Sequence, residues 1–248
     1  YKRKEGTFII PDSIQKIEGI KWYCIRVYED GSMGNVEFIE ETPVKIYVIL
    51  KNPRKPQKKP RTDVLEIACS SIEGCSNDTS EKFVRKIQDQ MVSGVWNWLD
   101  SNGIKYYDVN HIEGGILDEY FGTPIEGNLS FYLSVFLSEK KGNCQDSSAL
   151  YQICCNALGV PMMMNAYTAK KGNKPYQVTY RLVKLFGETR YDNTAFGMHM
   201  LGSPKKSGKK VFDPTCKFKN SPEFYFRWNR HDYLNDALKD SSEAKYVN

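Results

Sequence analysis

The stretch that decides how the chain is interpreted, residues 142–161, reads GNCQDSSALYQICCNALGVP. Its apolar residues recur at helical spacing, which predicts a helix with one buried face. These residues are Leu150, Ile153, Ala157 and Leu158. Gly159, followed by Pro161, predicts where the helix ends. Cys144 is therefore expected at, or just before, the first turn of the helix.

Cys144 would occupy a position with chemical consequences. The N–H groups and the positive end of the dipole at a helix start favour a thiolate, which is the nucleophilic form of cysteine. Asn143 is a candidate cap for this helix, and Gly142 leaves room for a substrate backbone to approach. The alternative is that Cys144 is a small buried apolar residue, as most free cysteines are.

A thiolate nucleophile needs a base, and the chain has three histidines, His111, His199 and His231. His199 lies in an apolar segment that predicts a strand, and Asp213 lies in a second strand after a basic turn. An antiparallel hairpin of the two strands would bring Asp213 beside His199. The carboxylate would then fix the imidazole tautomer so that the other ring nitrogen faces the thiol. Taken singly, His199 would be a core histidine and Asp213 a turn carboxylate.

The sequence Gly-Asn-Cys-x-Asp at residues 142–146, before a helix that ends in Leu-Gly-Val-Pro, resembles the nucleophile motif of the transglutaminase-like branch of papain-type cysteine enzymes. A downstream strand histidine followed by Phe-Asp-Pro-Thr is similar to the other two motif positions of that family. The resemblance covers roughly Phe83 to Phe218. It implies Cys144 as nucleophile, His199 as general base and acid, and Asp213 as the orienting carboxylate. The implied fold is α+β, with the nucleophile helix packed on an antiparallel sheet that carries the other two residues.

The resemblance also implies cysteine-dependent acyl transfer, with hydrolysis of a peptide or isopeptide bond as the favoured reaction. The tetrahedral oxyanion would bind the Cys144 backbone N–H and a second donor, for which Trp96, Trp98 and Asn143 are candidates. Each of these three is otherwise a packing or capping residue. Protein cross-linking by transamidation, and a non-catalytic binding or scaffold domain, stay open as alternatives.

The region before the motif predicts a small β-rich module. Three runs of β-branched and aromatic residues indicate strands, and no helical period occurs among them. These runs are 22–28, 36–39 and 44–50. The lysine- and proline-rich segment 51–61 predicts a solvated linker, with a contact strip for an anionic polymer as the alternative. We therefore expect a module over residues 1–60 and a catalytic domain over residues 61–248.

A long helix is predicted near the start of that second domain. Asp78, Thr79 or Ser80 can cap it, and Asn102-Gly103 is a good C-terminal stop. Its apolar residues fall at three- and four-residue steps, as expected for a helix with one buried face. They are Phe83, Val84, Ile87, Met91, Val95 and Trp98.

The bulk composition is that of a folded domain, with 40% hydrophobic and 26% charged residues among 248. A net charge of +5 does not by itself indicate nucleic-acid binding. No apolar run approaches the ~20 residues that cross a bilayer. The partner that the family resemblance implies is a peptide, protein or cell-wall peptide substrate.

Seven cysteines fit two situations. They fit three disulfides plus one reactive thiol in a secreted protein, and equally seven reduced thiols in a cytosolic one. Cys69 and Cys75 flank a turn and could bridge. A secreted or cell-surface location is slightly favoured over the cytoplasm. No Cys-x-x-Cys pair or histidine-rich tract gives zinc-ligand spacing, so neither a metal nor a cofactor is expected.

Overall fold

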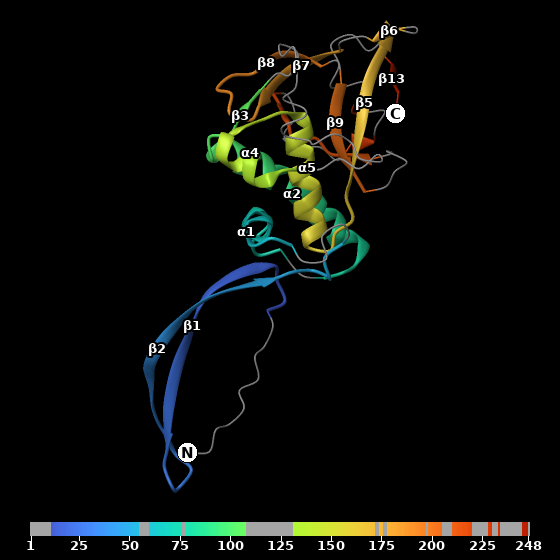
Figure 1. The fold of residues 1–248 in the computed structure, drawn as a ribbon. Helices are drawn as coiled ribbons and strands as arrows, with labels where there is room; N and C mark the ends of the chain where they lie inside the picture. The colour runs from blue at the N-terminus through green and yellow to red at the C-terminus, as the bar shows by residue number, and fades with distance from the viewer. Residues whose placement is uncertain are drawn as a thin grey trace.

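The structure is a computed structural model that describes residues 11–54, 60–75, 78–107, 131–171, 174–175, 178–196, 198–204, 210–219, 228–229, 233 and 245–247. These residues form a mixed α+β protein with mainly antiparallel sheets (Figure 1). A group of helices lies between a set of short sheets and a long two-stranded hairpin that projects from the body. The predicted α+β class is confirmed, whereas the predicted division at residue 60 stays a prediction.

The described residues form helices of which α1 and α2 pack against α5. The helices are α1 (Thr62–Ser71), α2 (Glu81–Ser101), α4 (Leu133–Glu139) and α5 (Cys144–Ala157). Helix α5 contacts α1, α2 and strand β9 (Met198–Ser203), and 12 of its 14 residues are buried. It is therefore the central element of the body, and the predicted helix start at Cys144 is confirmed.

Helix α2 also follows the prediction. Ser80 is its N-cap residue, and the helix ends before Asn102 and Gly103, the latter with φ of +69°. Helix α1 is not among the sequence predictions. It is only ten residues long and buries Val64 and Ile67 against the same core, so its stability comes from packing more than from local propensity. None of the described helices is long and apolar enough to span a membrane.

The hairpin consists of β1 (Gln15–Val27) and β2 (Met33–Val48), which pair antiparallel. The two predicted runs 36–39 and 44–50 form largely one strand instead of two. The register shifts by one residue where Pro43 and Val44 lie opposite Gly19, which has φ of +77°. A bulge accommodates proline because the bulged residue is not held in the hydrogen-bonded ladder.

Short strands complete the body. Strand β5 (Met163–Lys171) pairs with β6 (Lys174–Pro175), β9 and β13 (Lys245–Val247), and β7 (Val178–Leu185) pairs with β8 (Asp192–Phe196) and β11 (Cys216–Phe218), all antiparallel. Strand β10 (Lys210–Val211) pairs with β12 (Trp228–Asn229) antiparallel, and β3 (Lys105–Tyr106) pairs with β4 (Lys141–Gly142) in parallel.

The predicted hairpin is present only in part: β9 carries His199, but the second strand, β10, ends at Val211 and pairs with β12, so Asp213 follows the strand and is not in it. Gly202 of β9 and Phe212 exchange two backbone hydrogen bonds of 2.8 Å each in antiparallel geometry. A Cβ on Gly202 would come within 2.4 Å of the Tyr151 ring, so α5 packs tightly over this strand. This close approach sets where the start of α5 lies relative to β9.

Other expectations have mixed outcomes. No disulfide joins any of the seven cysteines, so the expected possibility of a Cys69–Cys75 bridge is not realised. Both side chains are buried thiols, and burial raises the pKa of each. Residues 55–59 of the predicted linker, residues 205–209 of the basic turn, His111 and His231 lie outside the described residues.

The contact between α1 and α2 is testable at Gly94. A Cβ there would lie 2.3 Å from the Ser71 Cβ and 2.8 Å from the Ser71 carbonyl oxygen. Gly94→Ala should therefore lower the free energy of unfolding by about 1–3 kcal/mol, although alanine favours helix. Denaturant unfolding measures this, with Asn97→Ala at an exposed position of the same helix as the control. Equal stability of Gly94→Ala and Asn97→Ala would contradict the close crossing.

Candidate active site

The start of α5 is held by a reciprocal cap. The Asn143 Oδ1 accepts hydrogen bonds from the backbone N–H of Gln145 (2.8 Å) and of Asp146 (3.4 Å). In return, the Asp146 Oδ2 accepts a hydrogen bond from the Asn143 backbone N–H at 2.8 Å. The predicted cap at Asn143 is confirmed, and the arrangement places Cys144 as the first residue of the helix.

Asp146 is 1% exposed and carries no ion pair among the described residues. Burial raises the pKa of Asp146 to about 7, although the hydrogen bond from the Asn143 N–H lowers it. Gly142 packs closely against Phe136 and Asp146. A Cβ on Gly142 would lie 2.5 Å from the Phe136 ring and 3.1 Å from the Asp146 Cβ. Close packing thus accounts for Gly142, where the sequence suggested room for a substrate.

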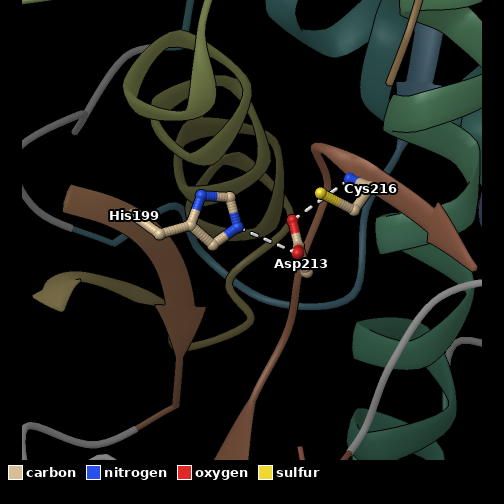
Figure 2. A group of neighbouring side chains, drawn as sticks. All are labelled: His199, Asp213 and Cys216. Carbon is tan, nitrogen blue, oxygen red and sulfur yellow. Dashed lines mark hydrogen bonds and ion pairs between the residues drawn. The ribbon is translucent and has the colours of Figure 1, made fainter. Parts of the chain in front are cut away.

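His199 and Asp213 are joined by a buried hydrogen bond. The His199 Nε2 lies 2.9 Å from the Asp213 Oδ2, and both side chains are 0% exposed (Figure 2). The Asp213 Oδ2 also accepts a hydrogen bond from the Tyr233 hydroxyl at 2.7 Å. The Oδ1 accepts from the backbone N–H of Thr215 (2.9 Å) and of Cys216 (3.2 Å). Four donors therefore hold this carboxylate in one orientation.

The charge of the pair follows from these contacts. Burial alone lowers the pKa of His199, but the Asp213 charge, its hydrogen bond and the neighbouring Cys144 raise it to about 10. Burial likewise opposes the charged form of Asp213, yet His199, Tyr233 and the Thr215 N–H keep the pKa of Asp213 below its usual value. The pair is therefore an imidazolium and a carboxylate at neutral pH.

Cys144 lies against the same imidazole. Its thiol forms a side-chain interaction with His199 that contributes to the raised histidine pKa. The His199 Nδ1, the nitrogen that does not bond Asp213, is buried and makes no well-aligned hydrogen bond. The sulfur is thus a neighbour of the buried imidazole. Of the three side chains, only Cys144 has any exposed surface, at 6%.

Two serines that the sequence did not single out fix α5 to both partner segments. The Ser148 Oγ donates to the Met200 carbonyl of β9 at 2.8 Å, beside His199. The Ser147 Oγ lies 2.8 Å from the Thr215 Oγ1, two residues after Asp213. These buried hydrogen bonds couple the position of Cys144 to the positions of the other two side chains.

The remaining candidates lie as follows. The Trp96 Nε1 donates to the Thr215 carbonyl at 3.2 Å, and the ammonium groups of Lys184 and Lys217 lie 5.1 and 5.0 Å from its ring centre. Trp98 is partly buried and packs against the main core. The sequence did not predict that either indole would bind a backbone carbonyl near Asp213. The Trp96 indole binds one, that of Thr215.

A metal could in principle use this cluster, because ligand atoms of His199, Asp213 and Cys216 all lie within 4.8 Å of one another. Figure 2 shows the three side chains converging from β9, the segment after β10 and β11. A carboxylate has about four lone-pair positions. His199, Tyr233 and two backbone N–H groups already occupy those of Asp213. The cluster therefore fits a hydrogen-bond network better than a set of metal ligands.

Comparisons with known proteins add little. The chain matches no protein-family model, and no curated protein matches it. Among solved structures, it is similar to one described as a “Putative Cysteine Protease from Cytophaga hutchinsonii”. The two share 13% sequence identity over 96% of this chain and 77% of that chain, with a TM-score of 0.24. Similarity at this level carries no conclusion about fold family, so the transglutaminase-like family stays a prediction.

The protonation state of His199 can be measured directly. In histidine NMR titrations of the folded protein, its ring should carry both protons at pH 8, because its pKa is raised to about 10. Asp213→Asn should bring the pKa below the ordinary value of about 6.5, since burial remains while the negative charge is lost. A neutral His199 ring at pH 8 in the unaltered protein would contradict this assignment.

The same shift predicts how stability depends on pH. The folded-state pKa of His199, about 10, exceeds the unfolded value of 6.5, so the folded state holds this proton more tightly. The stabilisation is complete below pH 6.5 and is lost as the pH rises through about 10. The gap in unfolding free energy between the unaltered protein and Asp213→Asn should therefore shrink over this interval.

Proposed function

We propose that the protein catalyses cysteine-dependent acyl transfer and hydrolyses a peptide or isopeptide bond. Cys144 is the nucleophile, His199 the general base and acid, and Asp213 the residue that orients the imidazole. The observation that carries the proposal is one buried imidazole that bonds Asp213 at 2.9 Å through Nε2 and has the Cys144 thiol as its other neighbour. The motif's resemblance to transglutaminase-like enzymes supports it, and we assign the activity to residues 61–248.

The first step forms a thioester. The proton of the Cys144 thiol resides on His199 before the substrate arrives, and the thiolate attacks the carbonyl carbon of the substrate amide. The carbonyl π electrons move to oxygen and give a tetrahedral oxyanion. When the C–N bond breaks, the His199 imidazolium protonates the leaving amine. The raised pKa of His199 favours the imidazolium beside a thiolate, and Asp213 stabilises that charge.

The second step releases the acid. Neutral His199 takes a proton from water, and the resulting hydroxide attacks the thioester carbonyl. The C–S bond then breaks, the carboxylic acid leaves, and the thiolate–imidazolium pair is restored. An amine in place of water would give transamidation by the same steps. Cys144 is 6% exposed whereas His199 and Asp213 are 0% exposed, so the sulfur is the member of the group that a substrate arriving from solvent would reach first.

Oxyanion stabilisation is assigned to the Cys144 backbone N–H, at the first position of α5, with Asn143 as the second donor to be tested. Asn143→Ser keeps an oxygen that can cap the helix but removes the amide N–H groups. Asn143→Ala removes both functions and should lower the unfolding free energy by about 1 kcal/mol. If Asn143 is the donor, Asn143→Ser should retain stability but lose kcat by about 100-fold or more. Unchanged kcat in this variant would leave Asn143 as a cap alone.

The central test is removal of the thiol. Cys144→Ala should abolish turnover of peptide or isopeptide substrates, because no other group replaces the nucleophile. Cys24→Ser is the matched control, since Cys24 is exposed on the hairpin and should leave activity unchanged. A library of peptide electrophiles, with the labelled residue mapped by mass spectrometry, identifies a substrate to assay. Normal turnover by Cys144→Ala would overturn the proposal.

Iodoacetamide distinguishes the enzyme from a non-catalytic scaffold. Near pH 6 an ordinary thiol, with pKa about 8.5, is almost wholly protonated and reacts slowly. Selective labelling of Cys144 at this pH is expected, and His199→Ala should abolish the selectivity. Preferential labelling of Cys24, which is far more exposed than Cys144, would instead support an inert fold.

A further inference from the structure

The far half of the β1–β2 hairpin has an uncovered apolar face. Apart from Gly34, every residue from 21 to 43 is exposed, so this part of the ribbon is not covered by the body. The near end is attached, because Ile14 and Val48 are buried and Tyr47 hydrogen-bonds Glu66 of α1 at 2.9 Å. Figure 1 shows the ribbon projecting away from the helices.

The strand register places the apolar residues on one side. Three cross-strand pairs alternate along β1, and alternate residues of a strand share a face. The pairs are Tyr23–Phe38, Ile25–Val36 and Val27–Met33. Each of these six side chains is between 45% and 74% exposed. The other face carries Trp22, Cys24 and Arg26 with the acidic partners Glu40 and Glu37.

We propose that this apolar face is the interface of a homodimer, in which two hairpins pack face to face about a twofold axis. An isolated two-stranded ribbon is marginally stable in water, and a third layer or partner is what normally stabilises it. Nine of the 13 strongly exposed large apolar side chains among the described residues belong to this hairpin. Apolar surface gathered in this way marks an interaction site.

The area fits a second copy of the chain. A fully accessible aromatic side chain presents roughly 150–250 Å² of surface, and an aliphatic one somewhat less. At their observed exposed fractions, the six side chains together present on the order of 600 Å² of surface to water. Complete burial of these side chains on two copies would remove at most about 1,200 Å² from water, at the lower end of specific interfaces. An interface about a twofold axis uses the same patch on both chains, and a uniformly apolar face is complementary to itself.

The charge distribution agrees with a protein partner of this kind. Residues 22–42 contain five carboxylates and one guanidinium, so the ribbon would repel nucleic acid and anionic lipid surfaces. Glu37 and Glu40 lie on the opposite face from the six apolar side chains. Face-to-face packing therefore keeps the carboxylates of the two copies apart and in water.

The interface would lie far from the candidate active site. The chain leaves the hairpin at Lys51, whose N–H donates to the Leu158 carbonyl at the C-terminal end of α5. Cys144 is at the other end of this helix, about 21 Å away at 1.5 Å per residue. Dimer formation and the proposed chemistry are therefore separable.

Sedimentation equilibrium of the full chain from about 1 to about 100 μM tests the proposal. The expected species has twice the 28.6 kDa mass of one chain. Ile25→Thr with Val36→Thr keeps β-branched residues in the ribbon while removing an opposed apolar pair, and should raise the dissociation constant at least about tenfold. The control, Cys24→Ser with Glu37→Gln, alters the neighbouring opposed pair on the other face and should leave it unchanged.

Two results would overturn the proposal. One is a monomer throughout this concentration range. The other is a dimer whose dissociation constant is the same for both double variants. Circular dichroism melting verifies that the body of each variant is folded. Turnover of a short peptide per chain should be the same in the two double variants, because the hairpin lies far from Cys144. Absence of turnover in the unaltered protein would contradict the proposed function and not the dimer.

Discussion

A buried hydrogen bond between His199 and Asp213 is the constraint on which the rest of the body depends. A carboxylate removed from water is strongly destabilising unless its lone pairs find donors. Asp213 receives four, from the imidazole, the Tyr233 hydroxyl and two backbone N–H groups. Satisfying one charge thus determines where β9, the turn after Asp213 and Tyr233 must lie. The same network gives the imidazole a fixed orientation and leaves its second nitrogen directed away from the carboxylate.

Helix α5 connects this network to the remainder of the core. An ordinary central helix would be apolar all round, but α5 buries a run of polar residues in its first turn and a half. Ser147 and Ser148 hydrogen-bond the segments that carry Asp213 and His199, while Asn143 and Asp146 cap each other. Buried polar side chains would destabilise a purely apolar core, but at the start of α5 their hydrogen bonds fix the position of the Cys144 sulfur. A site in which positioning groups are themselves buried and hydrogen-bonded is preorganised in the sense that catalysis requires.

The hairpin follows the opposite pattern. Polar groups near the candidate site are buried inside the protein, whereas the far half of the ribbon leaves its apolar side chains in water. These two regions are attached to opposite ends of α5. The proposed chemistry and the proposed association would therefore change independently, because neither region shares side chains with the other.

The sequence alone predicted those features of the structure that depend on residues close together in the chain. The cap at Asn143, the start of α5 at Cys144 and the bounds of α2 were predictable, because capping and helical periodicity act over short separations. The hairpin that was expected to carry Asp213 was predictable only in part, since β10 ends at Val211 and an isolated Gly202–Phe212 bridge brings Asp213 beside β9. Helix α1, the joining of two predicted runs into β2, the reduced cysteines and the contact from Tyr233 to Asp213 were not predictable. Tyr233 lies 20 residues from its partner, and no local pattern distinguishes it from other tyrosines. Such contacts are decided by which polar groups the folded core must satisfy, and only tertiary packing determines that.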